Sequence, residues 1–367
     1  MSLRVILTTG GTGGHIFPAL ATAQAILKKR PDAQILFIGG LYGPEKDIVE
    51  KAGIAFVGLP VRGVMGRGLK ALSALASIST GIGQSMNIVR EFRPHVTMGF
   101  GGYACFAAVF AAWLLRCPCA LHEQNAIPGA ANKLLGRIAR KICLSWPQPD
   151  GNPGFPPEKC VMTGNPIRTE IMDAVAEPGQ KRLFIMGGSL GARALNSMVV
   201  GMLPQLKDAG ISILHQTGAK EYDAVCEGYA AAGWSPEEIS LTVRPFIDDM
   251  AAAYAQCSLA FCRAGATSMA ELAATGTPAV YVPFPFAAHD HQTSNARTMQ
   301  GAGGGILLPQ DEAQAMAEKG ELAPMLISLL GDGARLAAMR EGARTLARPD
   351  AAEAVADILI DLAGSGR

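Results

Sequence analysis

The sequence predicts an α/β protein of two domains, each built on a parallel β-sheet, and three observations carry that prediction. Short apolar runs rich in Val, Ile and Phe alternate with longer helical patterns along nearly the whole chain, which is typical of βαβ units. The length of 367 residues fits two domains better than one or three. Each half also begins with a strand that runs into a glycine turn and then a helix, at 6–15 and at 184–192.

The expected strands form two groups, one in each half of the chain. They are 3–8, 34–38, 55–59, 95–99, 118–121 and 141–145, then 182–186, 211–215, 239–243, 258–262, 278–282 and 305–308. A proline-rich stretch at 147–157 and a short strand near 159–162 separate the groups, which places the hinge at about 163–168. The predicted domains are therefore 1–165 and 166–349. On pattern alone, the last helix, at about 350–364, could pack on either domain.

Charge is distributed unevenly between the two halves. Residues 1–165 carry 17 Lys and Arg against 8 Asp and Glu, a net charge of +9, whereas residues 166–367 carry 15 against 23, a net charge of −8. A protein that coats nucleic acid is expected to be uniformly basic, so nucleic acid is not an expected partner. Either the N-terminal half meets an anionic surface or substrate, or the two halves attract each other.

Composition and cysteine usage exclude several other classes. Hydrophobic residues make up 49% of the chain and charged residues 17%, enough for large cores and too apolar for a disordered protein. The eight cysteines show no C-x-x-C or Cys/His spacing, so we expect a reduced, cytosolic protein without structural zinc. The first strand begins at Leu3, with no apolar leader or cleavage site before the first glycines, so no export signal is expected.

Three glycine turns follow expected strands, at 10–14, 99–102 and 187–188. Glycine permits positive φ and close approach of a ligand, and the first N–H groups of the following helix favour a phosphate. The turns do not match G-x-G-x-x-G in register and no P-loop occurs, so neither NAD nor any other cofactor is expected. Three turns exceed what one nucleotide needs, which predicts a donor and an acceptor that both carry phosphate. The alternative interpretation is that these glycines are required only for tight turns and bind no phosphate.

Ligands of open parallel sheets bind outside the carboxyl ends of the strands, so two such domains predict a cleft lined by these turns. His15 lies there at the start of a helix, which favours a neutral imidazole able to accept a proton; a hydrogen bond within the loop is the alternative role. Four polar residues, 122–125, follow the strand at 118–121 and are expected to line the site.

Two further patterns each allow two interpretations. Glu271 lies three residues after Ser268, which fits a capping box and equally fits a carboxylate that accepts bonds from ribose hydroxyls. His289 and His291 are only two residues apart and have no evident third ligand, so hydrogen bonding within the loop is favoured over a metal site.

Residues 69–92 predict an amphipathic helix. Its apolar stripe is Leu69, Leu72, Leu75, Ile78, Ile82, Met86 and Val89. Seven of the nineteen residues at 71–89 are Ser, Thr, Gln or Asn, so the helix is not a membrane span. Basic residues flank it at Arg62, Arg67, Lys70, Arg90 and Arg93. The helix either lies on an anionic membrane or packs its stripe on its own sheet.

Taken together, the motifs resemble the MurG family of bacterial N-acetylglucosaminyltransferases, which convert lipid I to lipid II in peptidoglycan synthesis. The resemblance runs in order from about residue 4 to 310 and rests on these segments: Thr9 to His15, Gly99 to Tyr103, His122 to Asn125, Gly164 to Arg168, Gly187 to Ser189 and Ala266 to Glu271. It implies a GT-B fold with two Rossmann-like domains and a C-terminal helix that returns to the first. It also implies peripheral attachment to the cytoplasmic face of the inner membrane, and partners in cell-wall synthesis and division.

The resemblance further implies which residues bind the donor, UDP-N-acetylglucosamine. Ser189 and its loop would hold the diphosphate, the backbone at Ile247 the uracil and Glu271 the ribose. The other implied contacts are Arg168 for the nucleotide region, Asn125 and Gln292 for the sugar, Thr12, Gly13 and Gly14 beside it, and Ala266, Thr267, Ser268, Met269 and Ala270 at a helix start. The basic first domain would bind lipid I.

The chemistry implied is an inverting transfer. An acceptor hydroxyl attacks the anomeric carbon from the face opposite UDP, His15 is the leading candidate for the base, and helix N-terminal amides stabilise the diphosphate without a metal. Two alternatives stay open on sequence: a UDP-sugar epimerase or another lipid glycosyltransferase of the same architecture, and a non-catalytic regulator that binds UDP without turnover.

Overall fold

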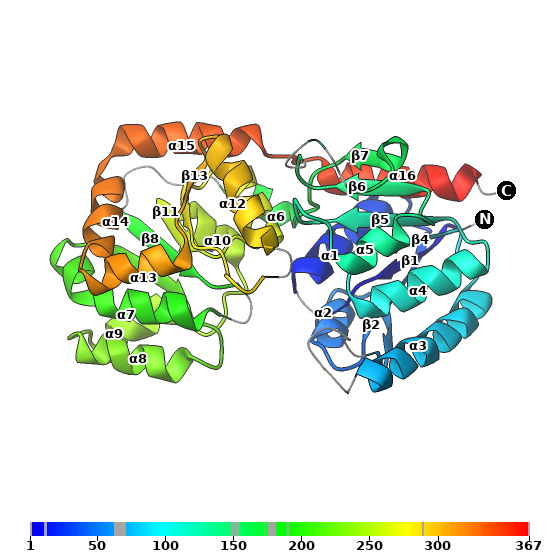
Figure 1. Cartoon of the computed structure of the whole chain (residues 1–367), viewed down its shortest axis with the longest axis horizontal. Coiled ribbons are helices and arrows are strands. Elements are labelled where there is room, and N and C mark those ends of the chain that lie inside the picture. The colour runs from blue at the N-terminus through cyan, green and yellow to red at the C-terminus, as the bar shows by residue number, and fades with distance from the viewer. Residues whose placement is uncertain are drawn as a thin grey trace. The chain divides into compact units, whose positions relative to one another are not determined.

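The computed structural model describes residues 2–10, 13–61, 71–147, 151, 154–172, 174, 181–188, 191–287 and 290–365, with the backbone alone for 71–75. The chain divides into two compact units (Figure 1). The N-terminal unit is Met1–Arg168 together with Arg348–Arg367, and the C-terminal unit is Thr169–Ala347. The last helix therefore belongs to the N-terminal unit.

A parallel seven-stranded sheet forms the centre of the N-terminal unit, in the order β3-β2-β1-β4-β5-β6-β7. Its strands are β1 (Arg4–Thr8), β2 (Gln34–Gly40), β3 (Ala55–Leu59), β4 (Val96–Gly99), β5 (Cys119–Glu123), β6 (Lys141–Leu144) and β7 (Cys160–Met162). In the middle of the sheet, Leu7 of β1 pairs with Phe37 on one side and Met98 on the other. Both faces of this region are buried, which is why the strands read as nearly continuous apolar runs.

Alternate residues of β1 supply two cores, one on each face of the sheet. Val5 and Leu7 pack with α1 (Gly13–Lys29) and α16 (Ala351–Ser365), whereas Ile6 packs with α3 (Ala71–Phe92) and α4 (Tyr103–Leu114). The shorter helices of the unit are α2 (Glu45–Lys51), α5 (Ala130–Leu135) and the 3-10 turn η2 (Pro157–Lys159). Val355 and Leu359 of α16 are fully buried in the first core, so this helix is an integral part of the unit.

The residues of the predicted apolar stripe that the structure describes in helix α3 pack inside the N-terminal unit. Val89 is buried, and Ile78 and Ile82 are partly buried, against the core shared with α4. Of the two interpretations of the stripe, packing on its own domain is therefore the correct one for these residues. The preceding basic residues, Arg62, Arg67 and Lys70, lie outside the described residues.

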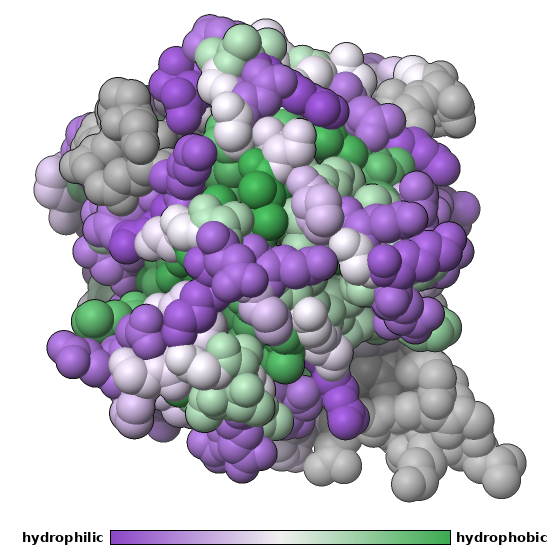
Figure 2. Space-filling view, turned by 90° about the vertical axis from the view of Figure 1, so that its left-hand side faces the viewer, coloured by the Kyte–Doolittle hydropathy of each residue, from purple (hydrophilic) through white to green (hydrophobic). Residues whose placement is uncertain are grey.

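The C-terminal unit contains a parallel six-stranded sheet in the order β10-β9-β8-β11-β12-β13. Its strands are β8 (Arg182–Met186), β9 (Ser212–Gln216), β10 (Val243–Arg244), β11 (Leu259–Cys262), β12 (Ala279–Tyr281) and β13 (Gly305–Leu307). The helices are α6 (Thr169–Met172), α7 (Arg193–Asp208), α8 (Tyr222–Ala231), α9 (Pro236–Thr242), α10 (Met250–Ala255), α11 (Ala266–Thr275), α12 (His291–Gly301), α13 (Gln310–Glu318), α14 (Leu322–Gly331) and α15 (Gly333–Thr345). Seen from the side at the left of Figure 1, hydrophilic side chains dominate the rim, and separate patches of apolar side chains lie nearer the middle with hydrophilic ones between them (Figure 2).

The strand predicted at 239–243 is wrong, because this segment is the helix α9 followed by the short β10. Ser235 caps the helix in a capping box with Glu238, and Pro236 occupies its first turn. The apolar residues Ile239, Leu241 and Val243, two of them β-branched, are typical of a strand. Local capping outweighs that composition here.

Candidate functional site

Two glycine turns of the N-terminal unit lie against each other at the carboxyl ends of the neighbouring strands β1 and β4. A Cβ atom added to Gly102 would lie 2.4 Å from the Cα of Gly10, and one added to Gly10 would lie 2.9 Å from the Cα of Gly102. Gly101 and Gly102 have φ values of +104° and +90°. These glycines are therefore needed for the turn and for the close contact, whatever they bind. Gly11 and the predicted ligand residue Thr12 lie outside the described residues.

His15 lies in the first turn of α1, which begins at Gly13 and Gly14, and it faces both glycine turns. Its Nδ1 lies 3.2 Å from the carbonyl oxygen of Gly10, and its Nε2 would lie 3.1 Å from a Cβ on Gly101. Because a carbonyl oxygen can only accept, Nδ1 carries the proton of this bond. In the neutral ring the lone pair then lies on Nε2, which leaves that nitrogen as the basic one.

His122, at the end of β5, is fully buried and is held from both sides of its ring. Gln124 Nε2 donates to Nδ1 at 3.1 Å, so the proton lies on Nε2, which donates to the carbonyl of Gly164 at 3.0 Å. The ring stacks on Phe100 at 5.5 Å. Burial, with a smaller contribution from the nearby His15, lowers the pKa of His122 to about 4. His122 is therefore a neutral structural residue.

Glu123 is buried, 2% exposed, and acts as an acceptor for the loop that follows β5. Its Oε1 accepts from the backbone N–H and the side-chain amide of Asn125, at 3.0 and 3.3 Å. Its Oε2 accepts from the Gly129 N–H at 3.1 Å and from Asn132 Nδ2 at 2.9 Å. These four donors hold the carboxylate and fix the position of Asn125.

Burial argues against the expectation that all four residues at 122–125 line the site, and leaves it as a prediction for Asn125. The first three are at most 2% exposed and bond within the unit, and only Asn125 is partly exposed. A polar run after a buried strand indicates a site, but the hydrogen-bond network decides which member faces outward. Arg168, at the end of the N-terminal unit, stacks its guanidinium over Phe17 of α1 at 4.8 Å, so the ring fixes the cation beside the start of that helix.

In the C-terminal unit, the turn after β8 closes against the end of β9. Gly188 and Gly191 have φ values of +86° and +76°, and a Cβ on Gly191 would lie 2.0 Å from the carbonyl oxygen of Thr217. The predicted diphosphate ligand Ser189 lies outside the described residues, between these glycines. Ile247, the predicted uracil contact, donates its N–H to Gln216 Oε1 at 3.0 Å.

Helix α11 begins at Ala266, with Gly265 as its N-cap and no side-chain capping bond. Ser268 is therefore the third residue of the helix and Glu271 the sixth, so the capping-box interpretation of this pair is wrong. Glu271 is 4% exposed and accepts a bond from Tyr254 OH at 2.9 Å. Of the other predicted donor contacts, Met269 is fully buried, Ala266 and Thr267 are buried, and Ser268 and Ala270 are half-buried.

Gln292, in the first turn of α12, is oriented by the backbone of the preceding loop. Its Oε1 accepts from the Phe284 N–H at 2.9 Å, so its Nε2 group is the end of the amide that is left to donate elsewhere. His289 lies outside the described residues. Within the part of the chain that the structure describes, no group of three His, Cys, Asp or Glu side chains could hold a metal ion.

Three residues near these groups were missed by the sequence patterns. Tyr254 bonds to Glu271, Gln216 bonds to Ile247, and Arg263 donates to the carbonyls of Val282 and Pro283, both at 2.9 Å. Burial lowers the pKa of Arg263 to about 10. Gln216 and Arg263 each lie at the carboxyl end of a strand, which is the one local signal that would have pointed to them.

Comparison with known proteins identifies the family. Residues 5–144 match the glycosyltransferase family 28 N-terminal domain, and residues 182–355 match the glycosyltransferase family 28 C-terminal domain. The chain is 50% identical over 371 residues to UDP-N-acetylglucosamine--N-acetylmuramyl-(pentapeptide) pyrophosphoryl-undecaprenol N-acetylglucosamine transferase of Nitratidesulfovibrio vulgaris (strain Miyazaki F), covering 96% of each chain.

Solved structures agree with this match. The crystal structure of Acinetobacter baumannii MurG is 32% identical, with a TM-score of 0.76 and coverage of 98% of this chain and 99% of that one. A UDP-N-acetylglucosamine 2-epimerase from Listeria monocytogenes, described as putative, is 16% identical with a TM-score of 0.68 over 97% and 95% of the chains, and shows a shared fold alone. The two sheets, the matched domains and these relatives confirm the predicted GT-B fold, and the chain belongs to glycosyltransferase family 28, within its MurG group.

Proposed function

We propose that this chain transfers N-acetylglucosamine from UDP-N-acetylglucosamine to lipid I, the undecaprenyl-pyrophosphoryl-N-acetylmuramyl-pentapeptide, to make lipid II for the bacterial cell wall. The observation that carries the proposal is the 50% identity, over 96% of both chains, to a relative named for this N-acetylglucosamine transfer. The 16% identity to the epimerase gives that activity no comparable support.

In this proposal the C-terminal unit binds the donor. The turn at 187–191, including Ser189, and the first amides of α11 would hold the diphosphate, since both follow the carboxyl ends of strands. Glu271 would accept from the ribose hydroxyls, and the backbone at Ile247 would contact the uracil. Because the Ile247 N–H bonds to Gln216, a uracil contact through that N–H would share or displace this bond. Gln292 and Asn125 would contact the sugar, the former through its Nε2 donor.

The reaction we propose is a single inverting displacement. The acceptor hydroxyl oxygen forms a bond to the anomeric carbon while the bond from that carbon to the diphosphate breaks, and the electron pair leaves with UDP. His15 Nε2 accepts the hydroxyl proton, because its Nδ1 is engaged by Gly10. Backbone N–H groups at the diphosphate stabilise the departing charge. Gly13, Gly14 and Thr12 would lie beside the reacting sugar.

A coupled assay tests this function directly. UDP release is measured from purified protein with UDP-N-acetylglucosamine, in the presence and absence of a lipid-pyrophosphate acceptor that carries N-acetylmuramyl-pentapeptide. We expect release that requires the acceptor and a product that contains both sugars. Acceptor-independent conversion of the donor would support an epimerase, and UDP binding without turnover would support a regulator; either result would contradict the transfer.

We further propose that the N-terminal unit binds anionic membrane at the amino ends of its strands. No single helix among the described residues is long and apolar enough to span a bilayer; α14 and α15 meet that criterion only as a pair, across an 87° bend. At the end of α4, Trp113 and Leu114 are 42% and 45% exposed, and the end of α3 lies near them. Apolar side chains next to cations are what an interfacial protein presents to headgroups.

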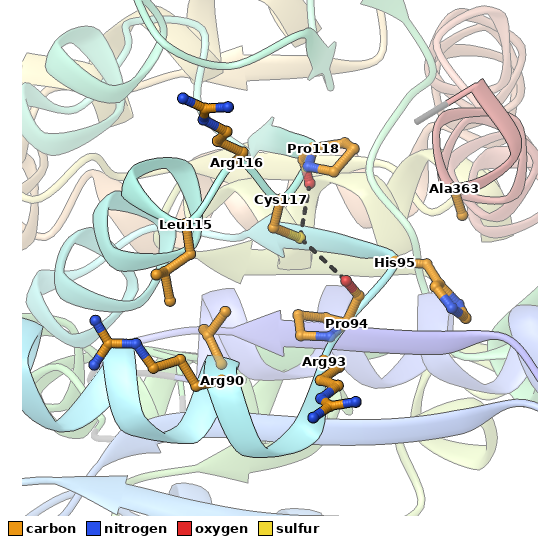
Figure 3. A pocket seen from close by; sticks show the side chains of 10 residues that line it. Arg90, Arg93, Pro94, His95, Leu115, Arg116, Cys117, Pro118 and Ala363 are labelled. Carbon is orange, nitrogen blue, oxygen red and sulfur yellow. Dashed lines mark hydrogen bonds between the residues drawn. The ribbon is translucent and has the colours of Figure 1, made fainter. Parts of the chain in front are cut away.

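A pocket of about 370 Å³ opens beside these helix ends and is lined by Arg90, Arg93, Arg116, His95 and Ala363 among others (Figure 3). The figure shows the three guanidinium groups pointing in different directions, so they form a basic rim rather than a preformed anion site. Arg93 and Arg116 adopt φ values of 51° and 61° at the ends of their helices.

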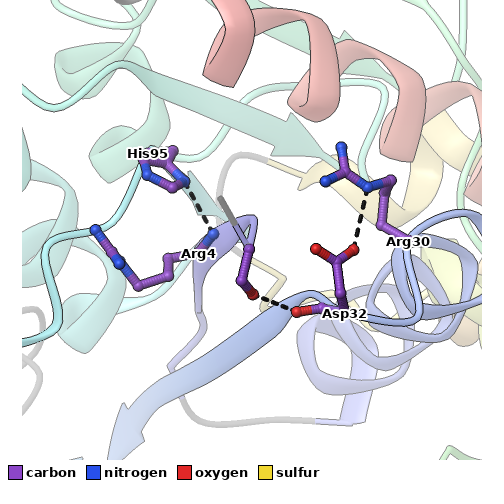
Figure 4. A network of polar contacts seen from close by, with 5 residues as sticks. Arg4, Arg30, Asp32 and His95 are labelled. Carbon is purple, nitrogen blue, oxygen red and sulfur yellow. Dashed lines mark hydrogen bonds and ion pairs between the residues drawn. The ribbon is translucent and has the colours of Figure 1, made fainter.

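The turn that carries part of this rim is held by the start of β1. The Arg4 N–H donates to His95 Nδ1 at 3.0 Å, and Arg4 Nε donates to the Arg93 carbonyl at 2.8 Å. Beside it, Ser2 bonds to the Asp32 carbonyl and Arg30 pairs with the Asp32 carboxylate at 3.3 Å, which lowers the pKa of Asp32 (Figure 4). The backbone beneath this part of the rim is therefore held to the start of β1.

Vesicle flotation tests the membrane proposal. Replacing both Arg93 and Arg116 by Glu should weaken binding to anionic vesicles by about 1 kcal/mol per residue, with a smaller effect at high salt. The matched control replaces Arg335 and Lys319 of the C-terminal unit by Glu. Binding that is unchanged by the Arg93 and Arg116 pair, or equally weakened by the control pair, would contradict this surface.

A further inference from the structure

Gln216 is a buried side chain whose amide is bonded at both ends. It is the last residue of β9 and is 4% exposed. Its Nε2 donates to the carbonyl oxygen of Gly188 at 3.1 Å, and its Oε1 accepts from the N–H of Ile247 at 3.0 Å. Since a carbonyl only accepts and an amide N–H only donates, the orientation of the Gln216 side chain is fixed by its partners.

The two partners belong to loops that are distant in sequence. Gly188 lies in the turn after β8, and Ile247 lies in the loop after β10. In the sheet, β9 lies directly between β8 and β10. A side chain at the carboxyl end of β9 is therefore placed to reach both loops, and the amide of glutamine matches a carbonyl on one side and an N–H on the other.

We propose that Gln216 is a positioning residue that holds the diphosphate turn and the uracil loop at a fixed spacing, so that the site fits an intact nucleoside diphosphate. This inference rests on the proposed function, in which the turn at 187–191 holds the diphosphate and Ile247 contacts the base. The Nε2 donor of Gln216 holds the turn at Gly188, and its Oε1 acceptor holds the loop at Ile247. Each end can therefore be disturbed separately.

Two substitutions separate the two ends. Gln216→Glu keeps an oxygen that accepts from Ile247 but replaces the donor with an oxygen that faces the Gly188 carbonyl. Protonation of this buried carboxyl would restore a donor, and burial favours the protonated form. Gln216→Met has a similar length and removes both bonds. The matched control is Gln205→Glu, an exposed residue of α7 in the same unit whose Nε2 lies 3.5 Å from the carbonyl of Gly320.

Affinities for UDP are measured by calorimetry and those for uridine by NMR titration, at pH 8 and pH 6. At pH 8 we expect Gln216→Glu to bind UDP about tenfold or more weakly than the wild type, because a buried carbonyl loses its donor, while uridine binding changes by about threefold or less. Gln216→Met should weaken both ligands. At pH 6 the ratio of wild-type to Gln216→Glu affinity for UDP should shrink, whereas Gln205→Glu should match the wild type at both pH values.

The outcomes distinguish this inference from the function beneath it. A wild-type protein that fails to bind UDP would remove the proposed function itself. A wild-type protein that binds UDP, with Gln216→Glu binding it equally well, would overturn the positioning role alone. The same conclusion would follow if Gln216→Glu lost uridine and UDP affinity to the same extent with no recovery at pH 6, because that pattern describes general loss of packing. Thermal unfolding of each variant identifies one that fails to fold, and a poorly folded Gln216→Glu without recovery at pH 6 counts against the inference.

Discussion

The ribose contact of Glu271 is the sharpest prediction for the donor site. The carboxylate is almost fully buried, and Tyr254 OH bonds to its Oε2 at 2.9 Å. A carboxylate can accept from several donors at once, since its two oxygens offer about four acceptor positions. Two ribose hydroxyls supply donors of that kind. Glu271→Ala should therefore weaken UDP binding strongly.

The magnitude follows from the number and type of bonds. Hydrogen bonds to a charged group contribute about 1.5–3 kcal/mol each, so the loss of two sets an upper range of about 3–6 kcal/mol. Water that enters the space left by the Glu271 side chain accepts from the ribose hydroxyls in its place and recovers part of the lost binding free energy. We expect UDP affinity to fall by about a hundredfold, which is about 2.7 kcal/mol. Tyr254→Phe keeps the carboxylate and removes one neutral bond, so it should cost about tenfold or less.

An analogue makes the assay specific. UDP and 2′,3′-dideoxy-UDP are titrated into the wild type, Glu271→Ala and Tyr254→Phe by calorimetry. If Glu271 binds the ribose hydroxyls, Glu271→Ala should bind both ligands equally, and the wild type should prefer UDP. An equal loss of affinity for the dideoxy compound, with a lower melting temperature, would show that Glu271 acts by packing and would refute the ribose contact.

Three further predictions test other groups. His15→Ala should lower kcat by at least about a hundredfold and flatten the acid limb of the pH profile of kcat, while the affinity for UDP stays nearly intact. A normal acid limb with only a small loss of kcat would show that His15 makes a hydrogen bond within the loop and is not the base. Gln292→Glu keeps an acceptor for the Phe284 N–H but loses the Nε2 donor. The variant should therefore bind UDP-N-acetylglucosamine about tenfold more weakly than the wild type and UDP as tightly as the wild type. An equal loss of affinity for both ligands would contradict a contact between Gln292 and the sugar. Burial lowers the pKa of His215 to about 3, so as the pH falls the imidazole takes up a proton in the unfolded chain before it does in the folded one. Urea unfolding should therefore show that the contribution of His215 to the free energy of unfolding is full above pH 6.5 and about 2 kcal/mol lower at pH 5. An NMR titration midpoint near 6.5 for His215 would contradict its burial.

The sheets were predictable from sequence because their signal is local. A strand buried on both faces, such as 182–186, is an apolar run whatever its neighbours are. The glycine turns were equally readable, since positive φ and close backbone contact demand glycine at Gly102 and Gly191. The strand expected at 239–243 was wrong because the expectation followed the apolar composition, whereas the capping box of Ser235 and Glu238 starts a helix there.

The parts of the site that could not be predicted depend on strand order. Tyr254 reaches Glu271 from α10, and Gln216 reaches Ile247 because β9 lies between β8 and β10. No local pattern records which strand neighbours which. The same limit applies to Ser268 and Glu271: their spacing fits a capping box, but the helix begins at Ala266, which moves both residues inside it.

The directions of the hydrogen bonds at His15 and His122 distinguish these two candidates for the base, which residue type alone does not. His15 and His122 lie close enough for His15 to lower the pKa of His122, yet their partners fix opposite tautomers. The basic nitrogen of His122 is Nδ1, and Gln124 already donates to it inside a fully buried network. The basic nitrogen of His15 is Nε2, because Gly10 accepts from Nδ1, and this ring is only partly buried. Burial and the bond from Gln124 keep an acceptor hydroxyl away from His122 Nδ1, so of these two histidines the assignment of the base falls on the partly buried His15.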